Sequence, residues 1–407
     1  MRKKLLIVEE ALKSPDNGHW FEYIKAIVAG CRAEDVDVTV AAHRDATHAV
    51  LEGLGARAVI PCSAWEGAYA GGALRRYAGV FRHNFRLHRA VKDFLAADDV
   101  YDCVLAPTVL VHHLLAWLWI ARRFGGKKFR RMTLLFLNAP GRYDSNGALR
   151  FPRSALLMKT ILRQFAPLVR SGLVTLAAET RRTAEHLKTF CGLEFVTAAQ
   201  AIALPAINPA NHATPVFGSF GFARHEQGSD LLQSAVRGFL AQHPETSAKF
   251  LIRWTHDFLG ADGALIRRDP VLLNDPRVEF LGSANSTDEY ARQFARADAL
   301  VLPYRLSSYR DRGSRVAAEA AMLGVPMIYA RGTWLEELVT HCGAGVDFRD
   351  EDVDDLVRAM GEMAANLDQH RAAARANAQK AREYFSPGRF VRRLFDGTSA
   401  LCDGVSF

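Results

Sequence analysis

The sequence predicts an α/β protein made of two doubly wound domains, each built on a parallel sheet covered by helices. Short apolar runs rich in β-branched residues alternate with longer helical patterns along the chain, which is typical of parallel sheets with crossover helices. The alternation occurs in both halves of the chain. A length of 407 residues also exceeds one typical domain. We therefore expect two domains of about 200 residues each.

Six strands are expected in each half. In the first half they cover residues 4–10, 36–42, 56–61, 101–107, 132–138 and 172–179. In the second half they cover residues 215–222, 248–254, 277–282, 299–305, 325–330 and 344–348. Helical segments separate most of these strands, for example Asp230–Gln242 and Asp352–Asn366. Ser286 and Glu289 form a capping-box pattern at the start of another helix.

The domain boundary is expected in residues 203–215, "ALPAINPANHATP", which are rich in proline and asparagine. We place the first domain at 1–205 and the second at 206–386. The remaining residues, 387–407, are expected to form a final helical segment.

Composition indicates a globular protein with a large core, because 49% of the residues are hydrophobic. The six cysteines are dispersed without a C-x-x-C pair, which favours neither a zinc site nor a disulfide framework. The basic start "MRKKLLIVEEALK" has too short an apolar run for a signal peptide. We expect a cytoplasmic location, with a peripheral position at the inner face of the plasma membrane left open.

The positive charge is concentrated in the first half of the chain. Residues 1–205 contain 29 Lys and Arg against 18 Asp and Glu, whereas the remainder contains 23 against 26. This bias predicts an anionic partner for the first half, such as a membrane surface, a phosphate-bearing acceptor or nucleic acid. Nucleic acid is disfavoured because no recognition motif accompanies the charge.

The centre of this charge is the helical pattern at residues 71–97. Arg75, Arg82, Arg86 and Arg89 fall within a stripe of about 60° when residues are placed 100° apart. Aromatic side chains lie away from the stripe or at its edge. A solvated helix face and an anionic-lipid contact both fit this pattern. A second basic cluster, residues 121–131, adds six cations and two phenylalanines.

The stretch "SSYRDRGSRVAAEAAMLGVP" (residues 307–326) carries the strongest functional pattern. It follows a predicted strand, and ligands of open parallel sheets bind at the carboxyl ends of strands. The helix is expected to begin near Ser314 or Arg315, where free backbone N–H groups suit a diphosphate. Glu319 then lies about one turn into the helix, within reach of ribose hydroxyls. Asp311 precedes the helix, so the layout fits a nucleotide sugar.

This stretch resembles the E-x7-E segment of retaining glycosyltransferases with the GT-B fold, especially glycosyltransferase family 4. Asp311 and Glu319 occupy the two acidic positions, and the helix runs into Gly324-Val325-Pro326. Residues 277–305 resemble the family's FLG strand, short helix and A-D-x-x-V-x-P segment. Residues 217–232 resemble its strand ending in G-R-x-x-x-x-K-G. The resemblance implies two Rossmann-like domains facing across a cleft, with a C-terminal helix that crosses back to the first domain.

Residue by residue, the resemblance implies a donor site in the second half. Glu319 is expected to hold the ribose and Asp311 the hydroxyls of the transferred sugar. The diphosphate is expected along Gly313, Ser314 and Arg315. The main chain near Gly282 is expected to border the base.

Four positions depart from the family pattern, and the first is Asp311, which stands where the family usually has Glu. The family's phosphate-binding Arg and Lys correspond to Phe222 and Gln227. Arg224, with His225 or Arg315, is therefore expected to supply cationic charge at the donor, where Gln227 is also placed. In the first half, Asn138 is the nearest counterpart of a histidine that faces the donor sugar.

The loop after the first strand is the other feature of the first half. In the family a glycine-containing loop at this place faces the cleft. Gly18 and Asn138 are expected on the acceptor side, and His19 is a candidate catalytic residue in contact with either substrate.

The function expected is retaining transfer of a sugar from a nucleoside-diphosphate sugar to a hydroxyl of a glycan, lipid-linked or small-molecule acceptor. No bound metal or other cofactor is expected, because no His/Asp spacing fits a ligand set. Two alternatives stay open: a non-catalytic nucleotide-sugar-binding protein, motivated by Phe222 and Gln227, and a nucleotide-sugar epimerase of the same fold. The sequence leaves open the base, the sugar, the acceptor and the oligomeric state.

Overall fold

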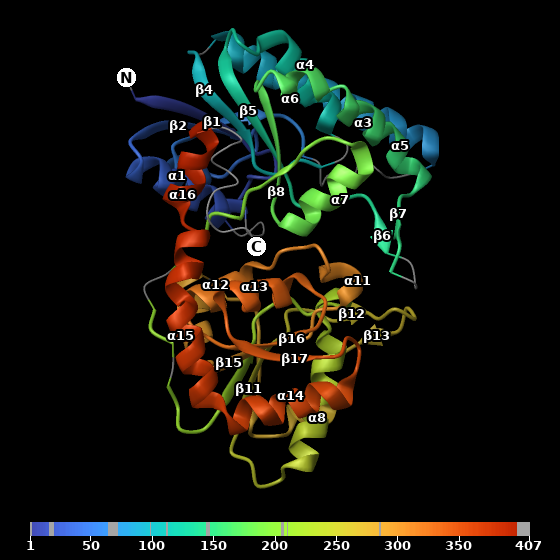
Figure 1. Cartoon of the computed structure of the whole chain (residues 1–407), viewed down its shortest axis with the longest axis vertical. Helices are drawn as coiled ribbons and strands as arrows, with labels where there is room; N and C mark the ends of the chain where they lie inside the picture. The colour runs from blue at the N-terminus through green and yellow to red at the C-terminus, as the bar shows by residue number, and fades with distance from the viewer. Residues whose placement is uncertain are drawn as a thin grey trace. The chain divides into compact units, whose positions relative to one another are not determined.

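The computed structural model describes residues 2–15, 20–63, 72–97, 99–110, 113–143, 147–204, 207–209, 211–284 and 286–396. The chain divides into two compact units (Figure 1). The first unit contains the residues up to Ala203 together with the segment that starts at Phe385. The second unit is Leu204–Tyr384. The chain thus passes between the units within two residues of the boundaries expected at 205 and 386.

The first unit contains a parallel seven-stranded sheet with the order β3-β2-β1-β4-β5-β8-β9. Its strands are β1 (Lys3–Val8), β2 (Val36–His43), β3 (Ala56–Ile60), β4 (Tyr101–Ala106), β5 (Phe129–Phe136), β8 (Val174–Ala178) and β9 (Val196–Thr197). Six of these strands are the predicted ones, and β9 has only two residues. A short hairpin of β6 (Arg142–Tyr143) and β7 (Leu149–Arg150) was not predicted either.

Helices cover both faces of this sheet. They are α1 (Trp20–Ala33), α2 (His48–Leu54), α3 (Ala73–Ala97), α4 (Leu114–Phe124), α5 (Leu156–Arg163), α6 (Ala166–Arg170), α7 (Arg181–Cys191) and α16 (Pro387–Asp396). Successive residues of β1 point to opposite faces. Leu5 and Ile7 pack with α1 and α16, whereas Leu6 and Val8 pack with α3 and α4. Burial on both faces explains the continuous apolar runs of these strands.

The second unit contains a parallel six-stranded sheet with the order β14-β11-β10-β15-β16-β17. Its strands are β10 (Val216–Ser219), β11 (Lys249–Arg253), β14 (Val278–Leu281), β15 (Ala299–Leu302), β16 (Met327–Ala330) and β17 (Gly345–Phe348). All six correspond to predicted strands. The hairpin of β12 (Phe258–Leu259) and β13 (Leu265–Ile266) is an addition that the sequence did not predict.

Helices connect the strands of the second unit, and one of them begins with the capping serine that the sequence indicated. They are α8 (Ser229–Gln242), α9 (Pro270–Leu273), α10 (Thr287–Ala295), α11 (Leu306–Tyr309), α12 (Arg315–Leu323), α13 (Trp334–Cys342), α14 (Val353–Ala365) and α15 (Leu367–Tyr384). The Ser286 hydroxyl accepts a hydrogen bond from the backbone N–H of Glu289 at 3.1 Å. Asp352 caps α14 in the same way, through the N–H of Asp355 at 2.9 Å.

The C-terminal helix α16 packs in the first unit, as predicted. Its apolar residues Phe390, Val391 and Leu394 are buried in the core that contains α1. The two helices approach so closely at Gly30 that a Cβ atom there would lie 2.5 Å from the backbone oxygen of Pro387. The glycine in the last turn of α1 is therefore required by packing against α16.

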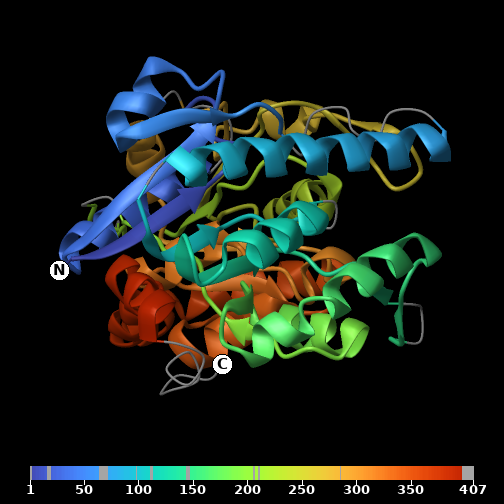
Figure 2. The ribbon, with the colours of Figure 1, turned by 90° about the horizontal axis from the view of Figure 1, so that it is seen from above.

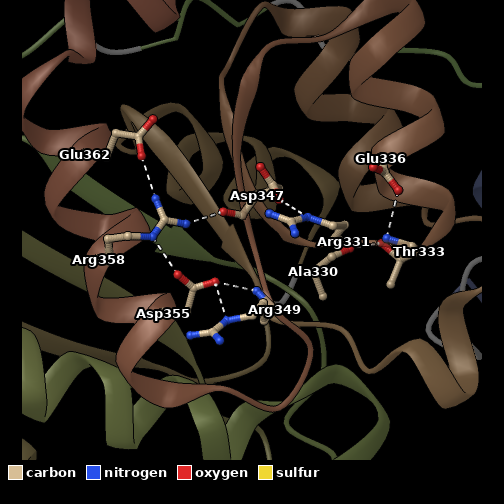
Figure 3. A network of polar contacts seen from close by, with 10 residues as sticks. Ala330, Arg331, Thr333, Glu336, Asp347, Arg349, Asp355, Arg358 and Glu362 are labelled. Carbon is tan, nitrogen blue, oxygen red and sulfur yellow. Dashed lines mark hydrogen bonds and ion pairs between the residues drawn. The ribbon is translucent and has the colours of Figure 1, made fainter.

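An exposed network of ion pairs and hydrogen bonds lies where β16 and β17 end (Figure 3). Arg358 of α14 donates to Asp355 at 2.6 Å, to Glu362 at 2.6 Å and to the backbone oxygen of Asp347 at 2.8 Å. Asp355 also accepts a hydrogen bond from the backbone N–H of Arg349. Because these groups are solvated, we expect them to contribute little to stability.

Among the residues that the structure describes, no helix is both long enough and apolar enough to cross a membrane.

Candidate functional site

Four loops of the second unit meet at one edge of its sheet. They follow β10, β11, β14 and β15, which are neighbours in the sheet and run parallel. Their carboxyl ends therefore lie side by side, where ligands of open α/β sheets bind. The residues that the sequence assigned to the donor all belong to the loops after β10, β14 and β15 or to α12.

Helix α12 begins at the residue that the sequence predicted. Ser314 is its N-cap, and its hydroxyl accepts a hydrogen bond from the N–H of Ala317 at 3.3 Å. Ser314 is only 8% exposed. Its side chain therefore stabilises the helix start, and the remaining N–H groups of the first turn are left for an anion.

Glu319 is buried one turn into α12, with 4% of its surface exposed. Its two oxygens have different partners. Tyr290 of α10 donates its hydroxyl to Oε2 at 2.7 Å, and Arg315 donates Nε to Oε1 at 2.8 Å. Burial, and then the Glu319 charge, raise the pKa of Tyr290 well above its ordinary value, so the phenol stays protonated and donates. A carboxylate offers about four lone-pair sites, so Glu319 can accept further hydrogen bonds.

Arg253 is a cationic residue at the same edge of the sheet, and the sequence analysis did not assign it to the site. It ends β11, and it donates to the backbone oxygen of Phe220 at 3.3 Å and to Gln293 at 2.8 Å. Its guanidinium lies 4.8 Å from the centre of the Tyr290 ring. Burial lowers its pKa from the usual arginine value, although Tyr290 and Glu319 oppose this. The available signal was its place at the end of a predicted strand.

The loop after β10 contains Phe222 and Gln227, which replace the family's phosphate-binding Arg and Lys. Phe222 is 47% exposed, and the guanidinium of Arg224 lies 5.2 Å from the centre of its ring. Gln227 donates Nε2 to the Tyr309 hydroxyl at 3.1 Å. Its Oε1 is buried and has no hydrogen-bond partner among the described residues. Gln227 thus offers an acceptor, where the family has a cationic donor.

A buried arginine holds this loop in place. Arg305 follows β15 and makes a bidentate contact with Asp230 of α8, at 2.9 and 2.7 Å. Between these elements, Gly228 has φ of +64°, and a Cβ atom there would lie 1.9 Å from the backbone oxygen of Pro303. Only glycine fits this approach. The Arg305–Asp230 contact and the close approach of Gly228 to Pro303 therefore fix the loop after β10 to the loop after β15.

The other predicted residues that the structure describes lie in loops of the two units. Asp311 and Gly313 are partly buried in the segment between α11 and α12, and Gly282 is exposed after β14. Asn138 is exposed in the first unit, in the loop after β5. Gly18 and His19 lie outside the described residues.

The comparisons with known proteins support a glycosyltransferase. Residues 214–366 match the model of the family described as glycosyl transferases group 1. The second unit is a glycosyltransferase domain. This segment contains every element of the edge described above. No curated protein sequence is similar enough to the chain to count as a relative.

Solved structures resemble the whole glycosyltransferase chain in fold. Sucrose-phosphate synthase from Thermosynechococcus elongatus has a TM-score of 0.63 at 13% identity, with 96% of this chain and 97% of that chain covered. An E. coli trehalose-6-phosphate protein bound with UDP-2-fluoro glucose has 0.64 at 9%, with 97% and 100% covered. Anabaena HepE in complex with UDP and glucose has 0.59 at 15%, with 96% and 98% covered. At these identities the likeness shows the fold, which is GT-B.

Proposed function

We propose that this glycosyltransferase moves a sugar from a nucleoside-diphosphate sugar to an acceptor hydroxyl with retention of the anomeric configuration. The observation that carries the proposal is the buried Glu319 carboxylate on α12. It lies at the carboxyl edge of four adjacent parallel strands, beside a helix start and two arginines. Retention rests on the resemblance to the E-x7-E segment, in which Asp311 has the first acidic position.

Binding of the donor is assigned as follows. Glu319 accepts hydrogen bonds from the ribose hydroxyls, and the diphosphate lies along the first turn of α12 from Gly313 to Arg315. Arg253 and Arg315 provide the positive charge that the family obtains from the positions of Phe222 and Gln227. Preorganised charge of this kind stabilises the leaving diphosphate.

The bond changes follow from these contacts. The bond between the sugar C1 and the diphosphate oxygen breaks, and a bond between C1 and the acceptor oxygen forms on the same face. The acceptor proton passes to the departing phosphate, so no protein base is required. Asp311 contacts hydroxyls of the transferred sugar while positive charge develops at C1.

The experiment that tests this function is donor hydrolysis and binding across a panel of nucleoside-diphosphate sugars. UDP-sugars come first in the panel, because two of the similar structures were solved with them. A donor should raise the melting temperature, because binding to the native state stabilises it, by about 2.7 kcal/mol at 100 times Kd. The same donor should be hydrolysed slowly. A stabilising donor that is never hydrolysed or transferred would contradict catalysis.

Asp311→Asn is expected to reduce turnover more than it weakens binding of the bare nucleoside diphosphate. The reason is that a contact with the transferred sugar gains strength as charge develops in the transition state. The turnover rate and the Kd for the diphosphate are measured for the same preparation. Asp354→Asn, a change of the same kind at an exposed position of α14, is the control. Equal losses of turnover and affinity would place Asp311 on the nucleotide.

Transfer is expected to proceed without a metal ion on the donor diphosphate, because arginines and the start of α12 supply its charge. Initial rates measured over minutes with EDTA and without added Mg²⁺ should remain within twofold of those with Mg²⁺. Rates that vanish with EDTA and return on addition of Mg²⁺ or Mn²⁺ would overturn this part of the proposal.

The acceptor is proposed to be at a membrane, reached through α3 of the first unit. Figure 2 shows this helix along its full length. Its arginines at 75, 82, 86 and 89 are exposed, as the sequence predicted. Beside them, Tyr77, Phe81 and Phe85 are 55%, 57% and 52% exposed, which the sequence did not predict. Leu156 and Leu157 of α5 are exposed as well. Adjacent cationic and aromatic surfaces are typical of helices that lie at a lipid interface.

The second basic cluster, residues 121–131, adds exposed cations but no exposed aromatic side chain. Its two phenylalanines, Phe124 and Phe129, are buried in the core, so only its cations face solvent. Arg122, Arg123 and Lys127 are exposed at the end of α4 and in the turn that follows.

Arg82→Glu/Arg86→Glu is expected to abolish binding to vesicles that contain anionic lipid. Each cation near such a surface contributes about 1 kcal/mol, so charge reversal of two should release the protein. The measurement is co-sedimentation with anionic and neutral vesicles at low and high salt. Arg170→Glu/Lys188→Glu makes the same change of net charge at exposed positions of α6 and α7, and this variant should bind normally. Negligible binding of the wild type to every vesicle would exclude the membrane.

A further inference from the structure

Three buried polar side chains meet in the first unit, outside the donor site described above. Glu10 follows β1, His83 lies in α3, and His113 immediately precedes α4. They are 6%, 5% and 2% exposed. Nε2 of His83 lies 3.0 Å from one carboxylate oxygen of Glu10, and Nε2 of His113 lies 2.9 Å from the other. We call these three residues the Glu10 cluster.

The shape of the Glu10 cluster is that of a chelating site. The two imidazoles stack with 4.9 Å between ring centres and 22° between planes, so both present Nε2 to the same carboxylate. The three ligand atoms all lie within 4.8 Å of one another. Zinc bonds of about 2.0–2.2 Å in a tetrahedral site hold neighbouring ligand atoms roughly 3.3 Å apart. Small movements of the side chains therefore suffice to admit an ion among them.

Surrounding contacts fix the two histidines before any ligand binds. The Cys62 thiol donates to the backbone oxygen of His83 at 4.0 Å, which ties this part of α3 to the segment after β3. Asn84, the next residue of α3, donates to the backbone oxygen of Val80 and accepts from the N–H of Ala116, both at 2.8 Å. This side chain holds α3 against the start of α4, where His113 lies. These backbone contacts hold the elements that carry the two histidines in place.

Charge and ligand type indicate which ion fits. Two imidazoles and one carboxylate form a nitrogen and oxygen set that suits zinc, cobalt or iron better than magnesium or calcium. A divalent ion would also compensate the charge of the buried Glu10 carboxylate. The spacing along the chain, at positions 10, 83 and 113, hides this set from sequence inspection.

We propose that Glu10, His83 and His113 bind one divalent transition-metal ion of the zinc class. The ion would join the end of β1 to α3 and to the start of α4. The proposal is independent of the donor site, which lies in the second unit. It differs from the expectation, drawn from the sequence, that no metal ion is bound.

The test uses the full-length protein without a histidine tag. After prolonged dialysis against chelator and removal of the chelator, the protein is titrated with Zn²⁺ in competition with a chromophoric chelator. Cobalt(II) is used as a spectroscopic probe in parallel. We expect one Zn²⁺ per chain, a rise in melting temperature on loading, and the intense visible absorption of a cobalt ion with few ligands.

Single variants Glu10→Gln, His83→Gln and His113→Gln should each weaken Zn²⁺ binding at least tenfold. His186→Gln is the matched control, because His186 is buried in the same unit and packs against Tyr143 and Phe151. It should bind as the wild type does. Circular dichroism checks that each variant is folded.

Four results would overturn the proposal. Wild-type protein that stays folded and takes up no stoichiometric Zn²⁺ would show that the Glu10 cluster is only a buried ion pair. Equal loss of binding in His186→Gln would place the ion elsewhere, as would unchanged binding in all three cluster variants. If the variants do not fold, absence of the cobalt absorption in the wild type alone decides against the site.

Discussion

Arg371→Ala is expected to lower the free energy of unfolding of the second unit by about 3–5 kcal/mol. The side chain of Arg371, on α15, is 7% exposed, and the side chain of its partner Asp298 is 0% exposed. Arg371 donates to Asp298 and also to the backbone oxygen of His212 at 3.0 Å. Removal of the guanidinium leaves a carboxylate in the core without its main counter-charge, which is costly.

The position of Asp298 explains why the effect should be large. This residue immediately precedes β15, and it accepts hydrogen bonds from the N–H of Val216 at 3.0 Å and from the N–H of His212 at 3.2 Å. One carboxylate thus joins the starts of two neighbouring strands to α15. Loss of Arg371 weakens all of these contacts together.

The expected loss is measured by urea denaturation, with hydrogen exchange of the β10 and β15 peptides to locate it. Arg358→Ala is the matched control, because it removes an arginine with more than one acidic partner from the exposed network of Figure 3. An exposed network of this kind should contribute at most about 1 kcal/mol. Similar losses for the two variants would show that burial is not what makes Arg371 important.

The sequence predicted the sheets well because each strand is specified locally. Buried parallel strands are short apolar runs, and they can be recognised without knowledge of their neighbours. The start of α12 was also predictable, since Ser314 and the helix that follows are contiguous. The strands β9, β12 and β13 were missed because each has only two residues, which is too short to show a periodic pattern.

The site was predicted only where its residues are close together in the chain. Glu319 and Arg315 were found, but their direct pairing and the contact with Tyr290 depend on how α10 packs against α12. Arg253 was missed because an arginine at a strand end has no distinctive spacing.

The exposed aromatic side chains of α3 were missed for a different reason. This helix has two apolar faces, and periodicity cannot tell which of them the core covers. Leu87, Val91 and Leu95 are buried, whereas Phe81 and Phe85 are exposed. Only the packing of α4 against α3 distinguishes the two faces.

Glu319→Gln is expected to weaken binding of the nucleoside diphosphate by about 10- to 150-fold, which corresponds to about 1.5–3 kcal/mol for a hydrogen bond to a charged group. The amide keeps the volume of the side chain and one acceptor oxygen, so the fold should persist. It loses the negative charge that strengthens hydrogen bonds from ribose hydroxyls. Calorimetry with the bare nucleoside diphosphate gives the affinity.

A structural role of Glu319 must be separated from a role in ribose binding, because the carboxylate also holds Tyr290 and Arg315. Tyr290→Phe removes one of these contacts and leaves the carboxylate charged. It should change the melting temperature more than the nucleotide affinity. Parallel losses of stability and affinity in both variants would assign Glu319 to the fold alone.

The ribose contact itself is tested with deoxy analogues of the same nucleotide. Wild-type protein should prefer the nucleoside diphosphate over its 2′-deoxy or 3′-deoxy form, because the missing hydroxyl leaves a buried acceptor without its partner. Glu319→Gln should lose most of this preference, while its affinity for inorganic diphosphate stays within twofold of the wild type. If the variant discriminates between ribose and deoxyribose as strongly as the wild type does, another group contacts the sugar hydroxyls. Since Glu319 is the buried acid of α12, that result would remove the observation on which the donor site rests.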